Sequence, residues 1–307
     1  MKKSFYLGVS IFTLFWLLSF FPALLPENLP PTAVRMLGAT LLMAIFWIAE
    51  TIPIAATSII PLGLFPFLGI ISAEEVASAY ASDVVLLLMT VFFIAKAVEK
   101  YNLHQRIAFY IISIVGTQPT RVILGFMVAT AVLSMWISNT AITLMMLPIA
   151  ISIIEQTALA NPNIDVGKTL GTSLMLGIAY AANIGGIGTP IGTPINLIFL
   201  AQLKENFPDN TPITFYQWMM VGVPAVLIFI LLTWIYLTKI TVKLDNNSLS
   251  SDYFKIPDKE VQKLGKMSQG EKYVAILFGL TALLWIFRAD ITIGSFTLTG
   301  WASYLGV

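Results

Sequence analysis

The chain has 307 residues, of which 57% are hydrophobic and only 11% are charged, and its mean hydropathy is +0.85. A soluble domain carries about 25% charged residues. The charged residues of this chain are too few to solvate the surface of a globule of this length. Together with a net charge of +1, this composition excludes a water-soluble enzyme, a disordered chain and a nucleic-acid binder. The absence of Cys excludes disulfides and thiolate chemistry, and the single His104 argues against histidine-based catalysis. The composition predicts an all-α polytopic membrane protein.

Apolar stretches that approach the length of a membrane span, about 20 residues, recur along the chain. They cover residues 5–25, 33–49, 52–71, 84–98, 122–154, 169–201, 217–238 and 273–287. The first is longer than the apolar core of a signal peptide, about 7–15 residues, so we expect a retained helix. Residues 241–270 are polar and are expected to form a cytoplasmic connector, and His104 is expected to be solvated.

The stretch 122–154 holds 33 residues without one charged side chain. A straight helix of that length would measure about 50 Å, whereas the hydrocarbon core of a membrane is about 30 Å thick. If the stretch enters the membrane and returns to the same side, 14 Lys and Arg residues lie in the cytoplasm and 3 outside; if it crosses once, the split is 8 to 9. The positive-inside rule favours the first arrangement. We therefore expect a re-entrant hairpin that opens to the cytoplasm, and a cytoplasmic N-terminus.

The stretch 169–201 has the same length, but in this topology its two ends lie on opposite sides of the membrane. Its centre, residues 185–196, reads GGIGTPIGTPIN, and four glycines and two prolines cannot sit in one regular helix. We expect a broken transmembrane helix with an unwound stretch near the middle of the membrane. Because lipid cannot satisfy unpaired backbone groups, this stretch must line a site enclosed by protein or filled with water.

Neutral oxygen donors cluster at the centre of the predicted hairpin. Ser134 and Ser138 stand one helical turn apart, so their hydroxyls can face the same point, and Asn139 and Thr140 would lie at the tip. Hydroxyl, amide and backbone carbonyl oxygens suit an alkali cation that must later leave. Hydrogen bonding between packed helices is the alternative, and it accounts better for isolated Ser or Thr residues than for this cluster.

The unwound stretch would supply the complementary half of such a site. Its carbonyls can coordinate a cation, while the N-terminus of the half-helix that follows presents N–H groups to an anion. Discontinuous helices that combine these two functions are typical of secondary transporters. Neither long stretch contains Lys or Arg, so a bound anion would need a cation beside it as a counter-charge.

The motif Ser138-Asn139-Thr140, followed by the run at 185–196, closely resembles the motifs of the divalent anion/sodium symporter family, and the resemblance covers the chain in segment order. It implies an inverted-repeat, elevator-type secondary transporter and no enzyme. Such a protein is normally a homodimer in the lipid of the cell membrane, and it imports succinate, malate or fumarate together with the sodium ion.

Carried onto this chain, the resemblance implies two sets of site residues. The sodium ion would be bound by Ser134, Ser138, Asn139, Thr189 and Gly192. The dicarboxylate would be bound by Asn139, Thr140, Thr193 and Asn196. Residues 194–196 read Pro-Ile-Asn where the family has Pro-Pro-Asn, a small departure that should leave the backbone site intact.

The resemblance also implies a division of the chain into parts. Residues 1–120 would be scaffold helices, 121–201 the transport region, 202–240 the sixth transmembrane helix, 241–270 the connector and 271–307 the first helix of a second repeat. Family members carry a second Ser-Asn-Thr hairpin and a second broken helix, and neither occurs in these 307 residues. We therefore expect residues 1–307 alone not to transport. A dicarboxylate exchanger of the same fold, or a non-transporting fragment of such a protein, remain as alternatives.

Overall fold

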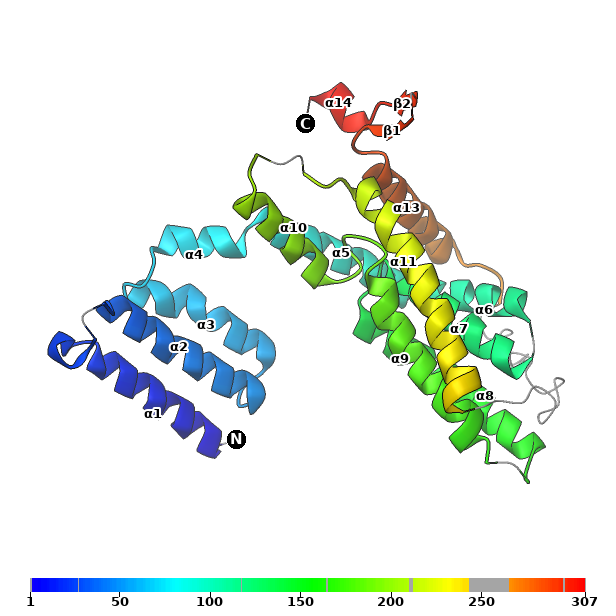
Figure 1. Ribbon diagram of the computed structural model, residues 1–307, viewed down its shortest axis with the longest axis horizontal. Helices are drawn as coiled ribbons and strands as arrows, with labels where there is room; N and C mark the ends of the chain where they lie inside the picture. The colour runs from blue at the N-terminus through cyan, green and yellow to red at the C-terminus, as the bar shows by residue number, and fades with distance from the viewer. Residues whose placement is uncertain are drawn as a thin grey trace. The chain divides into compact units, whose positions relative to one another are not determined.

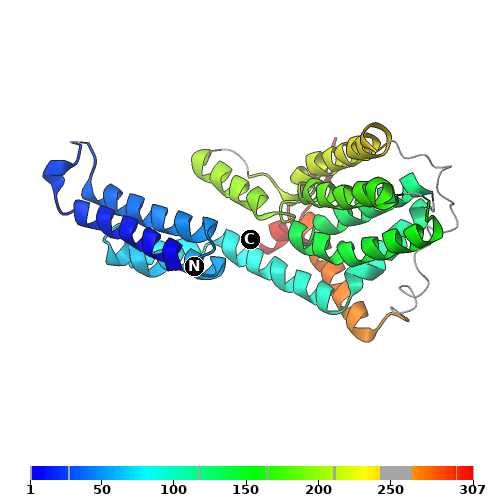
Figure 2. The same ribbon diagram turned by 90° about the horizontal axis from the view of Figure 1, so that it is seen from below.

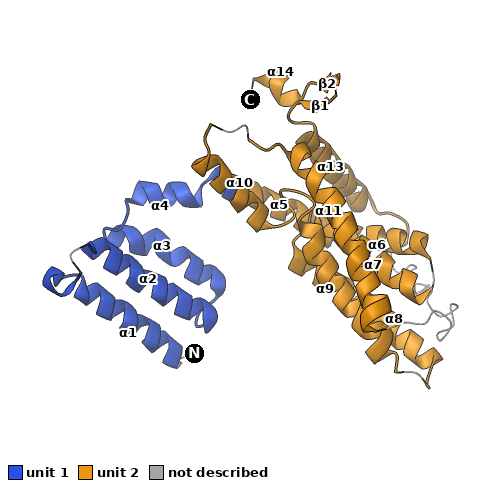
Figure 3. Ribbon diagram, viewed as in Figure 1, with its two compact units in different colours: residues 1–86 blue, residues 87–307 orange. Residues whose placement is uncertain are grey.

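The computed structural model describes residues 2–26, 28–116, 118–163, 165–209, 212–242, 265–294 and 296–306. The chain forms two compact units, Met1–Leu86 and Leu87–Val307 (Figure 3). Most of the predicted connector, 241–270, lies outside the described residues. Each unit is considered by itself.

The first unit is a small group of helices that lie side by side (Figures 1 and 2). Its elements are α1 (Lys2–Leu18), the 3-10 turn η1 (Pro22–Leu24), α2 (Pro31–Ile48), α3 (Ile54–Phe67) and α4 (Ala73–Tyr80). A Cβ added to Gly38 of α2 would lie 2.8 Å from the Phe15 side chain of α1. The absence of a side chain at Gly38 therefore lets the two helices approach each other closely. Arg35, near the beginning of α2, donates a hydrogen bond of 2.8 Å to the Leu68 carbonyl at the end of α3.

The second unit contains the two stretches that are too long for a single span. Its α-helices are α5 (Asp83–Lys100, which begins in the first unit), α6 (Leu103–Val115), α7 (Pro119–Ser134), α8 (Asn139–Ala160), α9 (Thr172–Gly186), α10 (Pro194–Asn206), α11 (Phe215–Ile235), α13 (Gln269–Ile286) and α14 (Trp301–Leu305). Two π-helical turns, η2 (Gly167–Gly171) and η3 (Tyr236–Thr241), precede α9 and follow α11, respectively. The antiparallel strands β1 (Ile291–Ile293) and β2 (Phe296–Leu298) lie between α13 and α14. Both long stretches are therefore interrupted, at 135–138 and at 187–193.

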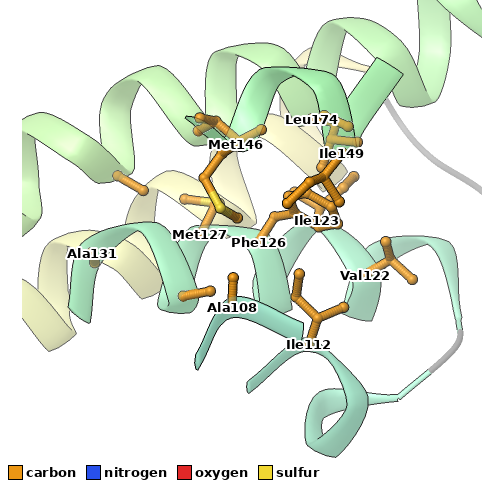
Figure 4. Close-up of a cluster of buried hydrophobic side chains, with 14 of the residues drawn as sticks. Ala108, Ile112, Val122, Ile123, Phe126, Met127, Ala131, Met146, Ile149 and Leu174 are labelled. Carbon is orange, nitrogen blue, oxygen red and sulfur yellow. The ribbon is translucent and has the colours of Figure 1, made fainter. Parts of the chain in front are cut away.

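The core of the second unit lies around α7, against which α6, α8, α9 and α11 pack (Figure 4). Met127 of α7 packs beside Met146 of α8, and Ile123 packs beside Ile149, so α7 and α8 run antiparallel and form a hairpin. A Cβ added to Gly177 of α9 would lie 3.1 Å from the Met127 side chain, and Gly185 faces the Ala131 backbone, so α9 runs parallel to α7. Several side chains of this core, among them Phe126, Ile123 and Met146, have no exposed surface.

Among the described residues, four helical segments are long and apolar enough to cross a membrane: Pro31–Ile48, Ala73–Lys100, Asn139–Ala160 and Phe215–Thr241. These, together with shorter apolar helices, confirm the prediction of an all-α membrane protein in its coarse form. The re-entrant path of the hairpin, the inverted repeat and the division of the chain into scaffold and transport parts stay predictions.

The prediction that His104 is solvated is wrong. Its side chain is only 3% exposed, and Nδ1 lies 3.3 Å from the Val98 carbonyl. The apolar residues Leu103, Ala108 and Phe109 are buried beside it on α6, a helix that the apolar spans did not predict. Arg106, on the same helix, forms a salt bridge of 2.9 Å with the buried Glu271 of α13, which links two helices that are distant in the sequence.

Candidate functional site

The turn between α7 and α8 gathers polar atoms at the end of a buried helix. Ser134 is fully buried, and its Oγ lies 2.8 Å from Asn139 Oδ1 and 2.6 Å from the Ala182 carbonyl oxygen of α9. A hydroxyl carries one proton, so it can donate to only one of these two acceptors at a time. The cluster therefore has one acceptor more than its hydroxyl can satisfy.

The unwound stretch between α9 and α10 is held by side chains as well as by its own backbone. Asn196, in the first turn of α10, donates from Nδ2 to the carbonyl oxygens of Gly186 and Thr189, at 2.8 Å in each case. Thr189 is fully buried and donates from Oγ1 to the Met135 carbonyl in the turn after α7. A single amide and a single hydroxyl thus tie α10, the break and the hairpin turn together.

The two interruptions meet without space for a side chain between them. A Cβ on Gly186 would lie 2.7 Å from Asn139 Oδ1, and a Cβ on Gly192 would lie 2.5 Å from the Gly186 carbonyl oxygen. Asn139 Nδ2 donates to Asn183 Oδ1 at 3.2 Å. Glycine is therefore required at 186 and 192 by close approach, because any Cβ would displace the oxygen atoms that form the cluster.

Five of the residues predicted for the site come together around Gly186: Ser134, Asn139, Thr189, Gly192 and Asn196. Three do not join this network. Ser138 is the N-cap of α8 and accepts from the Ala141 N–H, Thr140 is exposed, and Thr193 is the N-cap of α10 but makes no capping bond through its side chain. The role of every one of these residues in binding stays a prediction.

Sequence reasoning missed the contributions of Ala182, Asn183 and Gly186 as site residues. Asn183 could have been found, because it precedes the glycine run by two residues and faces the same turn of helix as Gly186. The Ala182 carbonyl could not, since a backbone oxygen carries no signal in the sequence and its role depends on the parallel packing of α7 and α9.

A cavity of about 880 Å³ borders the break on its other side. Pro190 and Ile191 line it, together with Trp285 of α13 and with Arg288 and Asp290, which follow that helix. Hydrogen bonds from the Gly300 N–H and the Ser303 hydroxyl lower the pKa of Asp290, so this carboxylate is ionised at neutral pH. The oxygen cluster itself is built from uncharged groups, whereas the cavity beside it carries both an Arg and an Asp.

Interrupted helices that bring neutral oxygen atoms together inside a helical membrane protein are typical of secondary transporters. The family model described as "Citrate transporter" matches residues 44–302. The sodium-dependent dicarboxylate transporter SdcS of Staphylococcus aureus, in strains NCTC 8325 / PS 47, COL and N315, is 41% identical over 266 residues, which are 86% of this chain and 51% of the relative. The chain spans about half the length of the curated relatives that it matches.

The chain belongs to the divalent anion/sodium symporter family, within the group that the citrate transporter model describes. The family consists of transporters, which agrees with the prediction from the sequence motifs.

Proposed function

We propose that the chain provides one half of the binding site of a secondary transporter that imports C4-dicarboxylates (succinate, malate or fumarate) together with sodium. The observation that carries this proposal is the surplus of acceptors around Ser134. Three oxygen atoms from α7, α8 and α9 converge there with one hydroxyl proton among them. A sodium ion would satisfy such a set, because it needs oxygen atoms and no proton.

The sodium site would use Ser134 Oγ, Asn139 Oδ1 and the backbone around Gly192, with Thr189 holding the break against the hairpin turn. Ser138 would contribute its backbone or a changed rotamer, because its hydroxyl caps α8 in the present arrangement. All these groups are neutral, so the site can bind the ion and release it again. Na⁺ acts here as a coupling ion rather than as a resident cofactor.

The dicarboxylate would bind next to the ion, at the beginning of α8 and α10. Thr140 is exposed on the first turn of α8, and Thr193 precedes α10 with a hydroxyl that makes no capping bond. Asn139 would orient a carboxylate toward these hydroxyls and toward the N–H groups at the start of α10, while Asn196, whose amide donates to Gly186 and Thr189, would hold the start of α10 in place. Because none of these donors is charged, the sodium ion supplies the counter-charge, and this makes transport of the anion depend on the cation.

Neutral donors recognise an oxyanion without measuring its carbon chain, so citrate is a candidate competitor as well as a candidate substrate. Uptake of labelled succinate should be measured with increasing unlabelled citrate. Half-inhibition by citrate at a concentration similar to that of unlabelled succinate would place tricarboxylates among the substrates.

The experiment that tests the function is uptake of labelled succinate into liposomes with an inward sodium gradient. We expect no uptake by residues 1–307 alone, and sodium-dependent uptake when the part of the Staphylococcus aureus relative that this chain does not match is supplied with it. Replacing sodium with choline should abolish that uptake. Uptake that persists in choline but requires dicarboxylate inside the liposomes would show an exchanger and overturn the coupling to sodium.

The path of the chain through the cell membrane is part of the proposal. The hairpin of α7 and α8 re-enters from the cytoplasm, residues 121–201 move as the transport region of an elevator, and the complete protein forms a homodimer. Single cysteines at Gln118 and Gln156, in this naturally Cys-free chain, should both react with a membrane-impermeant reagent from the cytoplasmic side, and a cysteine at Asn206 from outside. Labelling of the first two from opposite sides would show that the hairpin crosses the membrane.

The sodium ligands are tested by Ser134→Ala. This change should raise the sodium concentration for half-maximal uptake by roughly fivefold, which is the effect of losing about 1 kcal/mol, with a smaller effect at saturating sodium. An unchanged sodium dependence would remove Ser134 from the site.

A further inference from the structure

The helix α11 contacts the unwound stretch directly at two points. The Trp218 indole N–H donates to the Ile187 carbonyl oxygen at 2.8 Å. One turn further along α11, Gly222 is buried so close to the break that a Cβ would lie 2.8 Å from the Ile187 oxygen and 3.1 Å from the Gly188 oxygen. Both contacts are to backbone atoms, so they fix the position of the chain itself.

These carbonyls are the ones that the end of α9 leaves without a helical partner. A helix ends with carbonyl groups that have no N–H four residues ahead, and here Pro190 and Pro194 also remove two N–H groups from the stretch that follows. Side chains of the second unit replace the missing donors at two of these carbonyls: Asn196 donates to Gly186, and Trp218 donates to Ile187. Only the last of these comes from outside the hairpin and the broken helix.

We propose that Trp218 and Gly222 are positioning residues that set the affinity of the cation site by holding the Ile187 and Gly188 carbonyls against α11. This inference rests on the proposed function and assigns α11 a part in it. Because Thr189 follows Gly188 directly and bonds to the hairpin turn, a shift of the Ile187–Gly188 backbone also displaces Thr189 and the Asn196 amide that spans Gly186 and Thr189. The cation site loses affinity although neither Trp218 nor Gly222 touches the ion.

The chain contains a matched control for Trp218. Trp234 lies on the same helix and also donates its indole N–H to a backbone carbonyl, that of Thr120, at 2.7 Å. Thr120 lies at the opposite end of α7 from Ser134, far along the helix from the hairpin turn. Trp218→Phe and Trp234→Phe therefore remove the same kind of bond from the same helix, one at the break and the other away from it.

The test uses the purified chain in detergent and measures its melting temperature against sodium concentration, with choline chloride keeping the ionic strength constant. We expect Trp218→Phe to move the midpoint of sodium-dependent stabilisation upward by roughly fivefold, which corresponds to about 1 kcal/mol. Trp234→Phe should lower the melting temperature in choline but leave the sodium midpoint within about twofold of that of the unchanged chain.

Gly222→Ala is the second variant, with Gly279→Ala on α13 as its control, because a Cβ at 279 meets no atom within 4 Å. Gly222→Ala should shift the sodium midpoint upward at least as far as Trp218→Phe, and Gly279→Ala should not shift it.

Two failures can be told apart. If the unchanged chain is stabilised by sodium and Trp218→Phe has the same midpoint as Trp234→Phe, α11 only supports the fold and the positioning role is overturned. If the unchanged chain gains no stability in sodium over choline, the proposed sodium site falls, and the role of α11 falls with it.

Discussion

The two interruptions in the second unit differ in which groups donate hydrogen bonds to their backbone carbonyls. At 135–138 the chain turns within four residues, and the backbone closes the turn itself: the N–H groups of Trp136 and Ile137 both bond to the Leu133 carbonyl. At 187–193 the backbone also makes bonds of its own, but the Gly186 and Ile187 carbonyls take their donors from the side chains of Asn196 and Trp218. The turn is therefore closed mainly by its own backbone, with Thr189 as a donor from outside, whereas the break depends more on side chains from other helices. Changes around the break should therefore affect folding as well as binding, while changes at the turn affect binding alone.

The largest effect expected from this difference is that of Gly185→Ala. A Cβ at this position would lie 2.3 Å from the Ala131 carbonyl oxygen and 2.6 Å from the Ala131 Cα, so α7 and α9 would have to separate just before the break. We expect a loss of about 3 kcal/mol or more, seen as a low yield of folded protein and a lowered melting temperature. Gly63→Ala in α3 is the control, because its Cβ would meet nothing within 4 Å and should leave the stability unchanged or raised.

Asn139→Ala should produce the next largest effect, and at the turn it should be a functional one. The side chain lies beside both Ser134 and Gly186, and it is proposed to contact the sodium ion and the carboxylate. We expect sodium-dependent succinate uptake by the completed transporter to be lost, while the protein remains inserted and its melting temperature in choline changes little. Normal uptake by this variant would show that the site lies elsewhere.

Asn196→Ala tests whether the break depends on side-chain donors. The change leaves the buried Gly186 carbonyl without its side-chain donor and removes one donor from Thr189, so it should destabilise the fold by about 1–3 kcal/mol even without sodium. Melting curves in choline measure this effect. Equal melting temperatures for Asn196→Ala and Ser134→Ala in choline would mean that the break, like the turn, closes itself.

The sequence predicts both interruptions because each has a local cause. Glycine and proline cannot be held in a regular helix, which places the break. The 33 uncharged residues of 122–154 cannot form one straight span, which predicts an interruption there, and the Ser, Asn and Thr residues at 134–140 place it. Ser134 and Asn139 are predicted from their local pattern, whereas Thr189, Gly192 and Asn196 are predicted from the family resemblance, and these five residues do come together.

What could not be predicted depends on packing between residues far apart in the chain. Trp218 and Ile187 are 31 residues apart, and Arg106 and Glu271 are 165 apart, and neither pair follows a local pattern. His104 was expected to be solvated because basic residues surround it in the sequence, but the packing of α6 buries it. An N-cap serine such as Ser138 could have been distinguished from a ligand only by knowing that α8 begins at Asn139.

The smallest expected effect is that of pH on sodium binding. The oxygen cluster has no titratable side chain, so the sodium midpoint should be the same at pH 6 and at pH 8. The stability of the fold should behave differently because of His104 on α6. Burial lowers the pKa of this imidazole from its ordinary value of 6.5, and the Val98 carbonyl and the Glu99 carboxylate oppose the shift only in part.

A lowered pKa in the folded state means that the unfolded chain binds the proton first as the pH falls. The contribution of His104 to stability is therefore complete above about pH 6.5 and is lost as the pH drops from there toward the lower pKa of the folded state. Melting temperatures in choline should fall between pH 7 and pH 5, and His104→Gln should reduce this fall. A sodium midpoint that moves over the same range in both the unchanged chain and His104→Gln would mean that a titrating group belongs to the cation site.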